Sequence, residues 1–149
     1  MGSISAFGTG CAALILALAS SAPAQASEAT LDLTVNGLRN AKGSVLICVT
    51  GNPKAFPDCS KDANSRKLKI AAGQAGHVSI SGLAPGTYAV AIIHDENNNN
   101  KMDVFVMPKE GFGFSRNPRI MFGPPKYAEA AIALAAGENR QMIKLNYYL

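Results

Sequence analysis

The chain has 149 residues, and its 14 Lys and Arg against 10 Asp and Glu give a net charge of +4. This length is typical of one domain. The 14 Gly and 8 Pro are spread along the chain, which excludes a collagen, a coiled coil and a polytopic membrane protein. The positive charge is dispersed, without the basic arm or aromatic platform typical of nucleic-acid binders, so we expect no nucleic-acid partner.

The first 26 residues contain no charged side chain, and they are predicted to be a secretory signal peptide. Residues 11–18 form an apolar run too short to span a bilayer, and Ala24-Gln-Ala26 is a small-x-small cleavage site. We expect cleavage after Ala26, which leaves one mature domain over residues 27–149, periplasmic or secreted, without a transmembrane segment. The alternative is an uncleaved N-terminal anchor, because no Lys or Arg precedes the apolar run.

Two cysteines remain in the mature chain once cleavage removes Cys11. An even number of cysteines in an exported protein favours a disulfide, so Cys48 and Cys59 are predicted to be bonded. The alternative is a catalytic cysteine, which would leave one thiol without a role in an oxidising compartment. A redox pair usually has the Cys-x-x-Cys spacing, and ten residues separate these two.

Most apolar segments of the mature chain alternate apolar and polar residues with a period of two, which is typical of half-buried strands. The predicted strands are residues 31–35, 44–50, 67–70, 77–81, 88–94, 130–134 and 143–147. Residues 44–50 and 88–94 are apolar on both faces, as central strands are. The pattern predicts an all-β fold, an antiparallel immunoglobulin-like or transthyretin-like β-sandwich of about seven to eight strands.

The alternation also predicts which side chains are buried. The expected core residues are Leu33, Val35, Val78, Ile80, Val90, Ile92, Leu145 and Tyr147, and the expected surface residues are Asp32, Lys67, Lys69 and Lys144. The segment Tyr127–Ala136 is rich in Ala, and we interpret it as strand rather than helix. With Gly137-Glu-Asn139 as a turn, the last two strands are predicted to form a closing hairpin. Tyr88 follows a Pro-Gly turn and is expected to return its hydroxyl to a nearby backbone group.

The most specific local pattern lies in residues 95–103, where oxygen-bearing side chains recur at alternate positions, as in an EF-hand calcium loop. The candidate ligands are side-chain oxygens of Asp95, Asn97, Asn99 and Asp103, the carbonyl of Lys101, and Glu110 from across the loop. Two positions depart from the pattern, because Asn100 replaces the loop glycine and Val106 the final glutamate. Such a site would bind calcium with a dissociation constant of about 0.1–1 mM. The alternative is a polar, Asn-rich hairpin tip.

A second candidate site combines aromatic and basic residues after the calcium-like loop. Phe112, Phe114, Arg116 and Arg119 could form a patch that binds a sugar or an anion. The alternative is that these phenylalanines pack under a long loop and that the neighbouring glycines permit its bends.

Sequence motifs of catalysis are few. The two histidines, His77 and His94, lack a Gly-x-Ser-x-Gly elbow or another nucleophile at a recognisable spacing. The carboxylates are scattered, so the sequence nominates no acid–base pair, and there is no Gly-rich phosphate loop. We therefore expect no catalytic residues, and a hydrolase that uses the His94–Asp103 region is the remaining enzymatic alternative.

Six motifs follow one another along the mature chain. They are Leu33-Thr-Val-Asn-Gly-Leu-Arg-Asn-Ala-Lys-Gly43, Phe56-Pro-Asp, Gly82-Leu-Ala-Pro-Gly-Thr-Tyr-Ala-Val90, His94-Asp-Glu-Asn, Pro108-Lys-Glu-Gly-Phe-Gly-Phe-Ser115 and Phe122-Gly-Pro-Pro125. Over residues 30–148 they closely resemble the bacterial secreted domain-of-unknown-function family 2141. The resemblance implies a small exported β-sandwich and transfers no catalytic residue. Positions 98 and 100 often look Gly-like in that family, so Asn98 and Asn100 are a departure.

The Pro-Gly-Thr-Tyr turn is also similar to turns of carboxypeptidase-regulatory and transthyretin-like modules, which concerns the fold alone. We therefore expect an exported, non-enzymatic β-sandwich with a binding or structural role in the cell envelope. It requires no cofactor, and calcium is the one cofactor that the sequence suggests. The second hypothesis is a module that recognises an envelope glycan or another anionic partner, such as a protein, through the Phe/Arg loops.

Overall fold

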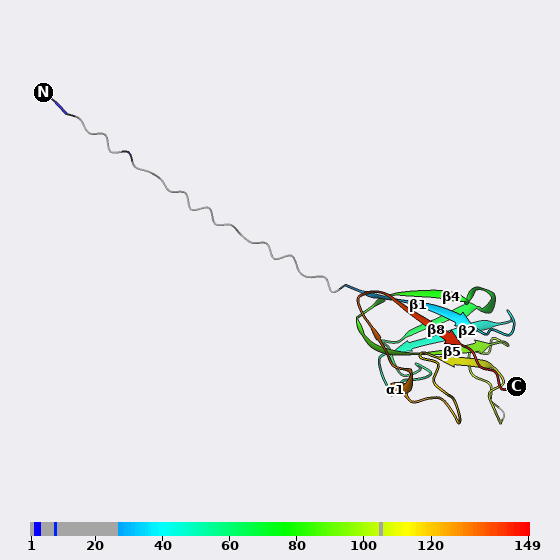
Figure 1. Ribbon diagram of the computed structural model, residues 1–149. Coiled ribbons are helices and arrows are strands. Elements are labelled where there is room, and N and C mark those ends of the chain that lie inside the picture. The colour runs from blue at the N-terminus through cyan, green and yellow to red at the C-terminus, as the bar shows by residue number, and fades with distance from the viewer. Residues whose placement is uncertain (1, 4–7, 9–26, 105) are drawn as a thin grey trace.

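The computed structural model describes residues 2–3, 8, 27–104 and 106–149. The predicted signal-peptide cleavage site after Ala26 lies outside the described residues. Two β-sheets pack face to face, and the described residues form eight strands with only two short helical segments (Figure 1). The predicted all-β sandwich is therefore confirmed. Neither described helix is long and apolar enough to cross a membrane.

Strands make up most of the elements along the chain. They are β1 (Ala29–Asn36), β2 (Ser44–Thr50), β3 (Arg66–Ala71), a 3-10 turn η1 (Ala72–Gln74), β4 (His77–Leu83), β5 (Gly86–Asp95), β6 (Gly111–Phe114), α1 (Tyr127–Ala130), β7 (Ile132–Leu134) and β8 (Gly137–Lys144). The long connection between β5 and β6 contains the calcium-like loop, and the connection between β6 and α1 contains the second candidate site.

The smaller sheet has the order β4-β1-β8, and the larger has the order β3-β2-β5-β6. Two strands pair with β5 along the same edge: β7 pairs with its first half and β6 with its second half. Neighbouring strands are antiparallel, with one exception: β1 and β8 run parallel from Ala29↔Gly137 to Asn36↔Lys144. The sandwich is thus mainly antiparallel and is closed by a parallel C-terminal strand.

The predicted closing hairpin is wrong, because β7 and β8 belong to different sheets and the expected turn residues 137–139 begin β8. The side chain of Asn139 explains the change of sheet. Its amide accepts the N–H of Ala135 and donates to the Ala135 carbonyl, so it replaces a hairpin ladder at the corner. The strand predicted over Tyr127–Ala136 is confirmed only at β7. The first residues of the predicted strand form the helix α1 instead, where the Glu129 carboxylate accepts the Lys126 N–H at 2.7 Å and caps the helix.

The core between the sheets confirms the predicted alternation. Seven of the eight expected core residues are buried: Leu33, Val35, Val78, Ile80, Val90, Ile92 and Leu145. Tyr147 is half-buried, and its hydroxyl lies 2.7 Å from the Nδ1 atom of the buried His94 ring. Lys67, Lys69 and Lys144 are exposed as predicted, whereas Asp32 is half-buried. The Tyr88 hydroxyl donates to the Ala84 carbonyl at 2.8 Å, as expected.

A second apolar cluster covers the outer face of the larger sheet and explains why its central strands are apolar on both sides. It contains Cys48, Cys59, Ala89, Ala91, Phe112, Phe114 and Ala130, with Phe56, Met102, Ile120 and Tyr127 packed against them. Successive residues of a strand point to opposite faces. Val90 and Ile92 of β5 therefore reach the core between the sheets, while Ala89 and Ala91 reach this outer cluster.

The glycines of β6 permit close packing rather than bends. A Cβ atom on Gly113 would lie 2.8 Å from the Ile143 Cγ2 atom and 2.8 Å from the Lys144 carbonyl, and one on Gly111 would lie 2.3 Å from the Tyr147 ring. Strand β6 thus presents its glycine face to the C-terminal segment and its phenylalanine face to the outer cluster. This division of the Gly-Phe-Gly-Phe motif was not predicted from the sequence.

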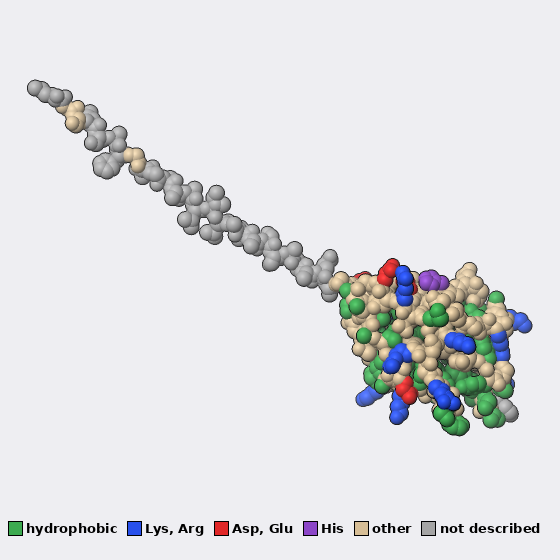
Figure 2. Space-filling view, in the orientation of Figure 1, with side chains coloured by type: hydrophobic (Ala, Val, Ile, Leu, Met, Phe, Trp, Pro, Cys, Tyr) green, Lys and Arg blue, Asp and Glu red, His purple; other side chains and the backbone are tan. Residues whose placement is uncertain are grey.

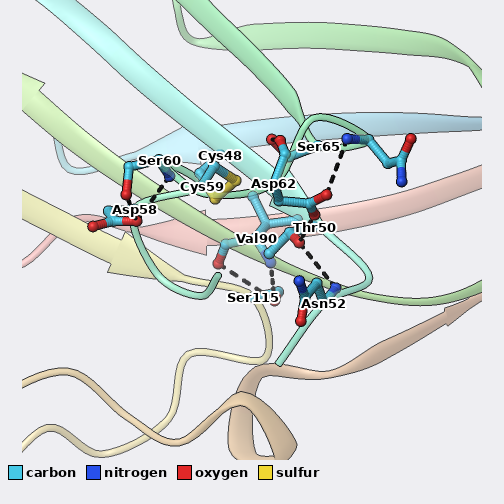
Figure 3. The surroundings of a disulfide bond; sticks show 11 residues. Cys48, Thr50, Asn52, Asp58, Cys59, Ser60, Asp62, Ser65, Val90 and Ser115 are labelled. Carbon is cyan, nitrogen blue, oxygen red and sulfur yellow. Dashed lines mark hydrogen bonds between the residues drawn. A yellow bond between two sulfur atoms is a disulfide. The ribbon is translucent and has the colours of Figure 1, made fainter. Parts of the chain in front are cut away.

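The predicted disulfide is present: Cys48 in β2 is bonded to Cys59, with their Cα atoms 5.7 Å apart (Figure 3). The bond holds the 51–65 connection against the outer face of the larger sheet. The same connection is fixed by buried Asp62, whose carboxylate accepts the Thr50 hydroxyl at 2.6 Å and the Asn64 N–H at 2.9 Å. These hydrogen bonds lower the pKa of Asp62. A disulfide indicates an oxidising, extracytoplasmic setting.

Candidate cation site in the 95–110 connection

The centre of the candidate site is Asp95, the last residue of β5, which is fully buried. One carboxylate oxygen accepts the N–H of Asn99 at 3.1 Å, and the other accepts the N–H of Asn100 at 2.8 Å. The loop therefore folds back over the carboxylate and satisfies it with backbone donors. A buried carboxylate needs such donors, because an unpaired charge is costly away from water.

The outer side of the loop is closed by Asp103. Its two carboxylate oxygens accept the amide groups of Asn97 at 2.5 Å and of Asn99 at 2.8 Å. The amide oxygen of Asn97 accepts the backbone N–H of Asn99 at 3.0 Å, and that of Asn99 accepts the backbone N–H of Lys101 at 3.1 Å. The amide donors lower the pKa of Asp103, so its carboxylate stays ionised.

Glu110 closes the connection from the start of β6, and it is only 3% exposed. Its Oε2 atom accepts the Asp103 N–H at 3.0 Å. Its Oε1 atom is buried and has no hydrogen-bond partner among the described residues. Burial is the main cause that raises the pKa of Glu110, and the nearby negative charges of Asp95 and Asp103 raise it further, while the backbone N–H groups of Asp103 and Glu96 act in the opposite direction.

Two asparagines of the loop have left-handed backbone conformations, Asn98 with φ of 60° and Asn100 with φ of 63°. Asn is one of the few non-glycine residues that adopt this conformation readily, which explains how it replaces glycine here. Each side chain also anchors the loop to the larger sheet. Asn98 accepts the Ser44 hydroxyl at 2.6 Å, and Asn100 accepts the Lys69 ammonium at 2.6 Å.

The structure brings five of the six predicted calcium ligands into one connected network of carboxylates and amides. They are Asp95, Asn97, Asn99, Asp103 and Glu110. The sixth, Lys101, is exposed and donates its N–H to Asn99. Among the described residues, no group of three or more His, Cys, Asp or Glu side chains is arranged to hold a metal. The residues of the network carry carboxylate and amide oxygens, the types of ligand that calcium takes, and the amide NH2 groups of Asn97 and Asn99 face Asp103.

A family model described as "Uncharacterized protein conserved in bacteria (DUF2141)" matches residues 33–142, about three-quarters of the chain. The chain belongs to the DUF2141 family. The match runs from the second half of β1 through most of β8, and it includes the whole 95–110 connection. No curated protein and no solved structure matches the chain. The similarity to carboxypeptidase-regulatory and transthyretin-like modules therefore stays a prediction.

The aromatic half of the predicted Phe/Arg patch of this DUF2141 domain is not at the surface. Phe112 and Phe114 are 4% and 6% exposed and pack in the outer cluster, because the glycines of β6 face the other way. Arg116 and Arg119 are exposed, and Arg116 donates to the Ala128 carbonyl at 3.2 Å. The four residues thus do not form one surface, and a sugar cannot stack on these two rings without repacking of the cluster.

His94 of the DUF2141 domain is fully buried next to the candidate site. Its Nδ1 atom lies 2.7 Å from the Tyr147 hydroxyl and its Nε2 atom 2.8 Å from the Lys42 carbonyl. A carbonyl can only accept, so Nε2 carries the proton and Nδ1 accepts from the hydroxyl. Both ring nitrogens are thus used within the fold.

The sequence analysis missed an ion pair that fixes the start of the connection. Arg39 binds Glu96 at 2.5 Å and lies over the Tyr147 ring, with 4.6 Å between its guanidinium carbon and the ring centroid. Asn40 also donates to the Glu96 carboxylate, at 2.5 Å. The Arg39 hydrogen bond is the main cause that lowers the pKa of Glu96 to about 2. The only sequence signal for this pair was the turn-rich segment 37–43, which lies far from Glu96 in the chain.

Proposed function

We propose that this DUF2141 domain is an exported, non-enzymatic calcium-binding β-sandwich of the bacterial cell envelope, released from an N-terminal signal peptide. The ion would be held in the 95–110 connection by Asp95, Asp103 and Glu110, with amide oxygens of Asn97 and Asn99 and the carbonyl of Lys101. Rotation of each amide about χ2 would present its oxygen to the ion instead of its NH2 group.

The observation that carries this proposal is the buried Oε1 atom of Glu110, which has no partner among the described residues. Its carboxylate lies close enough to those of Asp95 and Asp103 for their charges to raise its pKa. A cation would stabilise a buried carboxylate that two neighbouring carboxylates repel. Hard oxygen ligands favour calcium over zinc, and the one nearby imidazole, His94, has both nitrogens engaged elsewhere.

Calcium would give this loop a structural role. It would replace the repulsion between Glu110 and the two aspartates by attraction, and so join the end of β5 to the start of β6. Sites with few formal charges and an extracellular setting have dissociation constants of about 0.1–1 mM, so the ion would be retained where calcium is millimolar.

The proposal is tested by thermal unfolding of the exported, disulfide-bonded protein with calcium, with magnesium and with a chelator. At ten times the dissociation constant, binding to the folded state alone adds about 1.4 kcal/mol, which raises the Tm by roughly 3–6 °C. The variant Asp103→Asn should lose this rise, while the matched control Glu138→Gln, an exposed carboxylate in β8, should keep it. If calcium left the Tm of the wild type unchanged, the proposal would be wrong and residues 95–103 would be only a polar hairpin tip.

A further inference from the structure

We propose that the domain docks on an anionic membrane surface through two apolar loop tips, one at Val104, Val106 and Met107 and the other at Met121 and Phe122. The inference goes beyond calcium binding and does not depend on it. The described side chains that form these tips are Val104, Val106, Met107, Met121 and Phe122.

The tips are unusually exposed for apolar side chains. Phe122 is 95% exposed, Val106 82% and Met121 69%. Only three other large hydrophobic side chains of the described residues are exposed, and two of them, Tyr148 and Leu149, are at the C-terminus. Such residues scattered singly need no explanation, but their concentration in two loops marks an interaction site.

Both loops start from the same part of the fold. Met102 before the first tip and Ile120 before the second both pack on the outer cluster of the larger sheet. The Tyr148 hydroxyl contacts the Ile120 carbonyl at 3.4 Å, and its ring packs edge-on against Phe112. Figure 1 shows two loops that project from the lower edge of the domain, and Figure 2 shows hydrophobic side chains at that edge.

Two backbone contacts join the ends of the first loop. A β-bridge joins Val104 to Pro108, and the Lys109 N–H donates to the Asp103 carbonyl at 3.0 Å. These contacts fix the base of the first loop, which limits the conformational freedom that is lost on binding. Preorganisation of this kind favours binding.

The charge around the tips matches an anionic surface. Residues 104–109 and 116–126 contain four basic side chains, Lys109, Arg116, Arg119 and Lys126, and no acidic one. Next to the second tip lies an open pocket of about 340 Å³, whose lining includes Arg119, Lys144 and Tyr148. Two cations and a phenolic hydroxyl around one pocket suit the phosphate of a lipid headgroup.

The shape favours a bilayer over a protein partner. The apolar residues lie on separate projecting tips, with cations behind them, whereas a protein interface buries a continuous core of side chains. Insertion of apolar side chains beside Lys and Arg is the usual basis of interfacial membrane binding. The extracytoplasmic setting indicated by the disulfide places the domain in a compartment bounded by phospholipid.

The test is co-sedimentation of the exported, disulfide-bonded protein with vesicles of phosphatidylglycerol and phosphatidylcholine, and with vesicles of phosphatidylcholine alone, both in a chelator. We expect binding to the anionic vesicles only, weakened in ~0.5 M salt because exposed charges are screened. Phe122→Ser with Val106→Ser should reduce the partition coefficient about tenfold or more, because binding scales with the apolar area inserted. Met142→Ser, which changes an apolar side chain that is 60% exposed in β8, should leave it unchanged.

A third variant, Arg119→Gln with Lys144→Gln, tests the headgroup pocket and should weaken binding to anionic vesicles while circular dichroism stays native. Free inorganic phosphate at millimolar concentration should not compete, because the bilayer supplies both the phosphate and the apolar phase. Wild type that stays in the supernatant with anionic vesicles would overturn the proposal. So would a Phe122/Val106 variant that binds as well as wild type. Concentration-dependent dimerisation abolished by that variant, without vesicle binding, would assign the tips to a second copy instead.

Discussion

The Oε2 atom of Glu110 accepts the main-chain N–H of Asp103 at 3.0 Å, while the other oxygen of the same carboxylate is buried and has no hydrogen-bond partner in the described part of the chain. The hydrogen bond fixes the carboxylate at the mouth of the loop, so Glu110 cannot turn to solvent without breaking it. The Glu110 carboxylate is therefore held in place, although only one of its two oxygens has a hydrogen-bond partner among the described residues. This local imbalance leads to the first prediction.

Without calcium, Glu110→Gln is expected to raise the Tm at neutral pH. The neutral amide can still accept the Asp103 N–H, and it removes a charge whose folded-state pKa is raised by burial and by Asp95 and Asp103. A carboxyl with a raised folded-state pKa destabilises the fold above that pKa, and the penalty disappears as the pH falls to its unfolded value of about 4.5.

The advantage of Glu110→Gln should therefore shrink as the pH is lowered from 7 toward about 4.5, the unfolded-state value of a glutamate. Thermal unfolding at a series of pH values in a chelator measures it. Glu138→Gln is the control, because that carboxylate is exposed in β8. A Glu110→Gln protein that melts below wild type at every pH would show that the carboxylate is already satisfied without a cation.

A second prediction concerns the left-handed position Asn100. Asn100→Val should destabilise the fold by about 1–2 kcal/mol, because a β-branched side chain at positive φ meets the following carbonyl. Asn100→Gly relieves the strain and loses only the side-chain contact with Lys69, so its unfolding free energy should stay within about 1 kcal/mol of wild type. Chemical denaturation distinguishes the two. Equal losses in both variants would mean that the Lys69 contact, not the backbone conformation, makes asparagine important.

The disulfide supports a third prediction. Replacement of both cysteines, Cys48→Ala with Cys59→Ala, should reduce the free energy of unfolding by roughly 2.5–3 kcal/mol, from the loop-closure entropy of the released segment. The fold should persist, because Asp62 still holds the connection through Thr50. Urea unfolding of the variant and of reduced wild type should agree. Free thiols at both positions in exported protein, detected by mass spectrometry, would contradict the pairing.

The Arg39–Glu96 pair gives a fourth prediction, in the acid range. A carboxyl with a depressed folded-state pKa contributes stability that is complete above its unfolded value, about 4.5, and is lost as the pH falls through the folded value of about 2. Since the pair is partly exposed, its contribution at neutral pH should be about 1 kcal/mol or less. Glu96→Gln should lower the unfolding free energy at pH 7 and match wild type near pH 2. A constant difference across that range would exclude the ion pair as its cause.

The sequence predicted the strands well where alternation is set by one buried face, as in Leu31, Leu33 and Val35 of β1. It also predicted the hydrogen bond from the Tyr88 hydroxyl to a nearby backbone group and the Cys48–Cys59 disulfide. It failed where a single side chain or a distant surface decides the local structure. The Asn139 amide separates β7 from β8, and the parallel pairing of β8 with β1 depends on contacts more than a hundred residues apart.

For the candidate site, the spacing of oxygen-bearing residues identified the loop, and Glu110 was placed beside it correctly. The anchors outside the loop, Ser44 and Lys69, carry no sequence signal, because they come from neighbouring strands of the sheet. The Phe/Arg patch failed for a related reason. A Gly-Phe repeat does not say which face is buried until Ile143 and Tyr147 of the C-terminal segment are packed against it.

The most direct test of the central claim is a calcium titration that follows the backbone amide resonances of the 15N-labelled, disulfide-bonded protein. If the 95–110 connection binds the ion, the amides of Asp95, Asn99, Asn100 and Asp103 should shift and saturate with a dissociation constant of about 0.1–1 mM. Amides of β1 and β4 should stay in place, and Asp103→Asn should abolish the shifts. Amide resonances of this connection that do not move in ~10 mM calcium, well above that affinity class, would contradict the account.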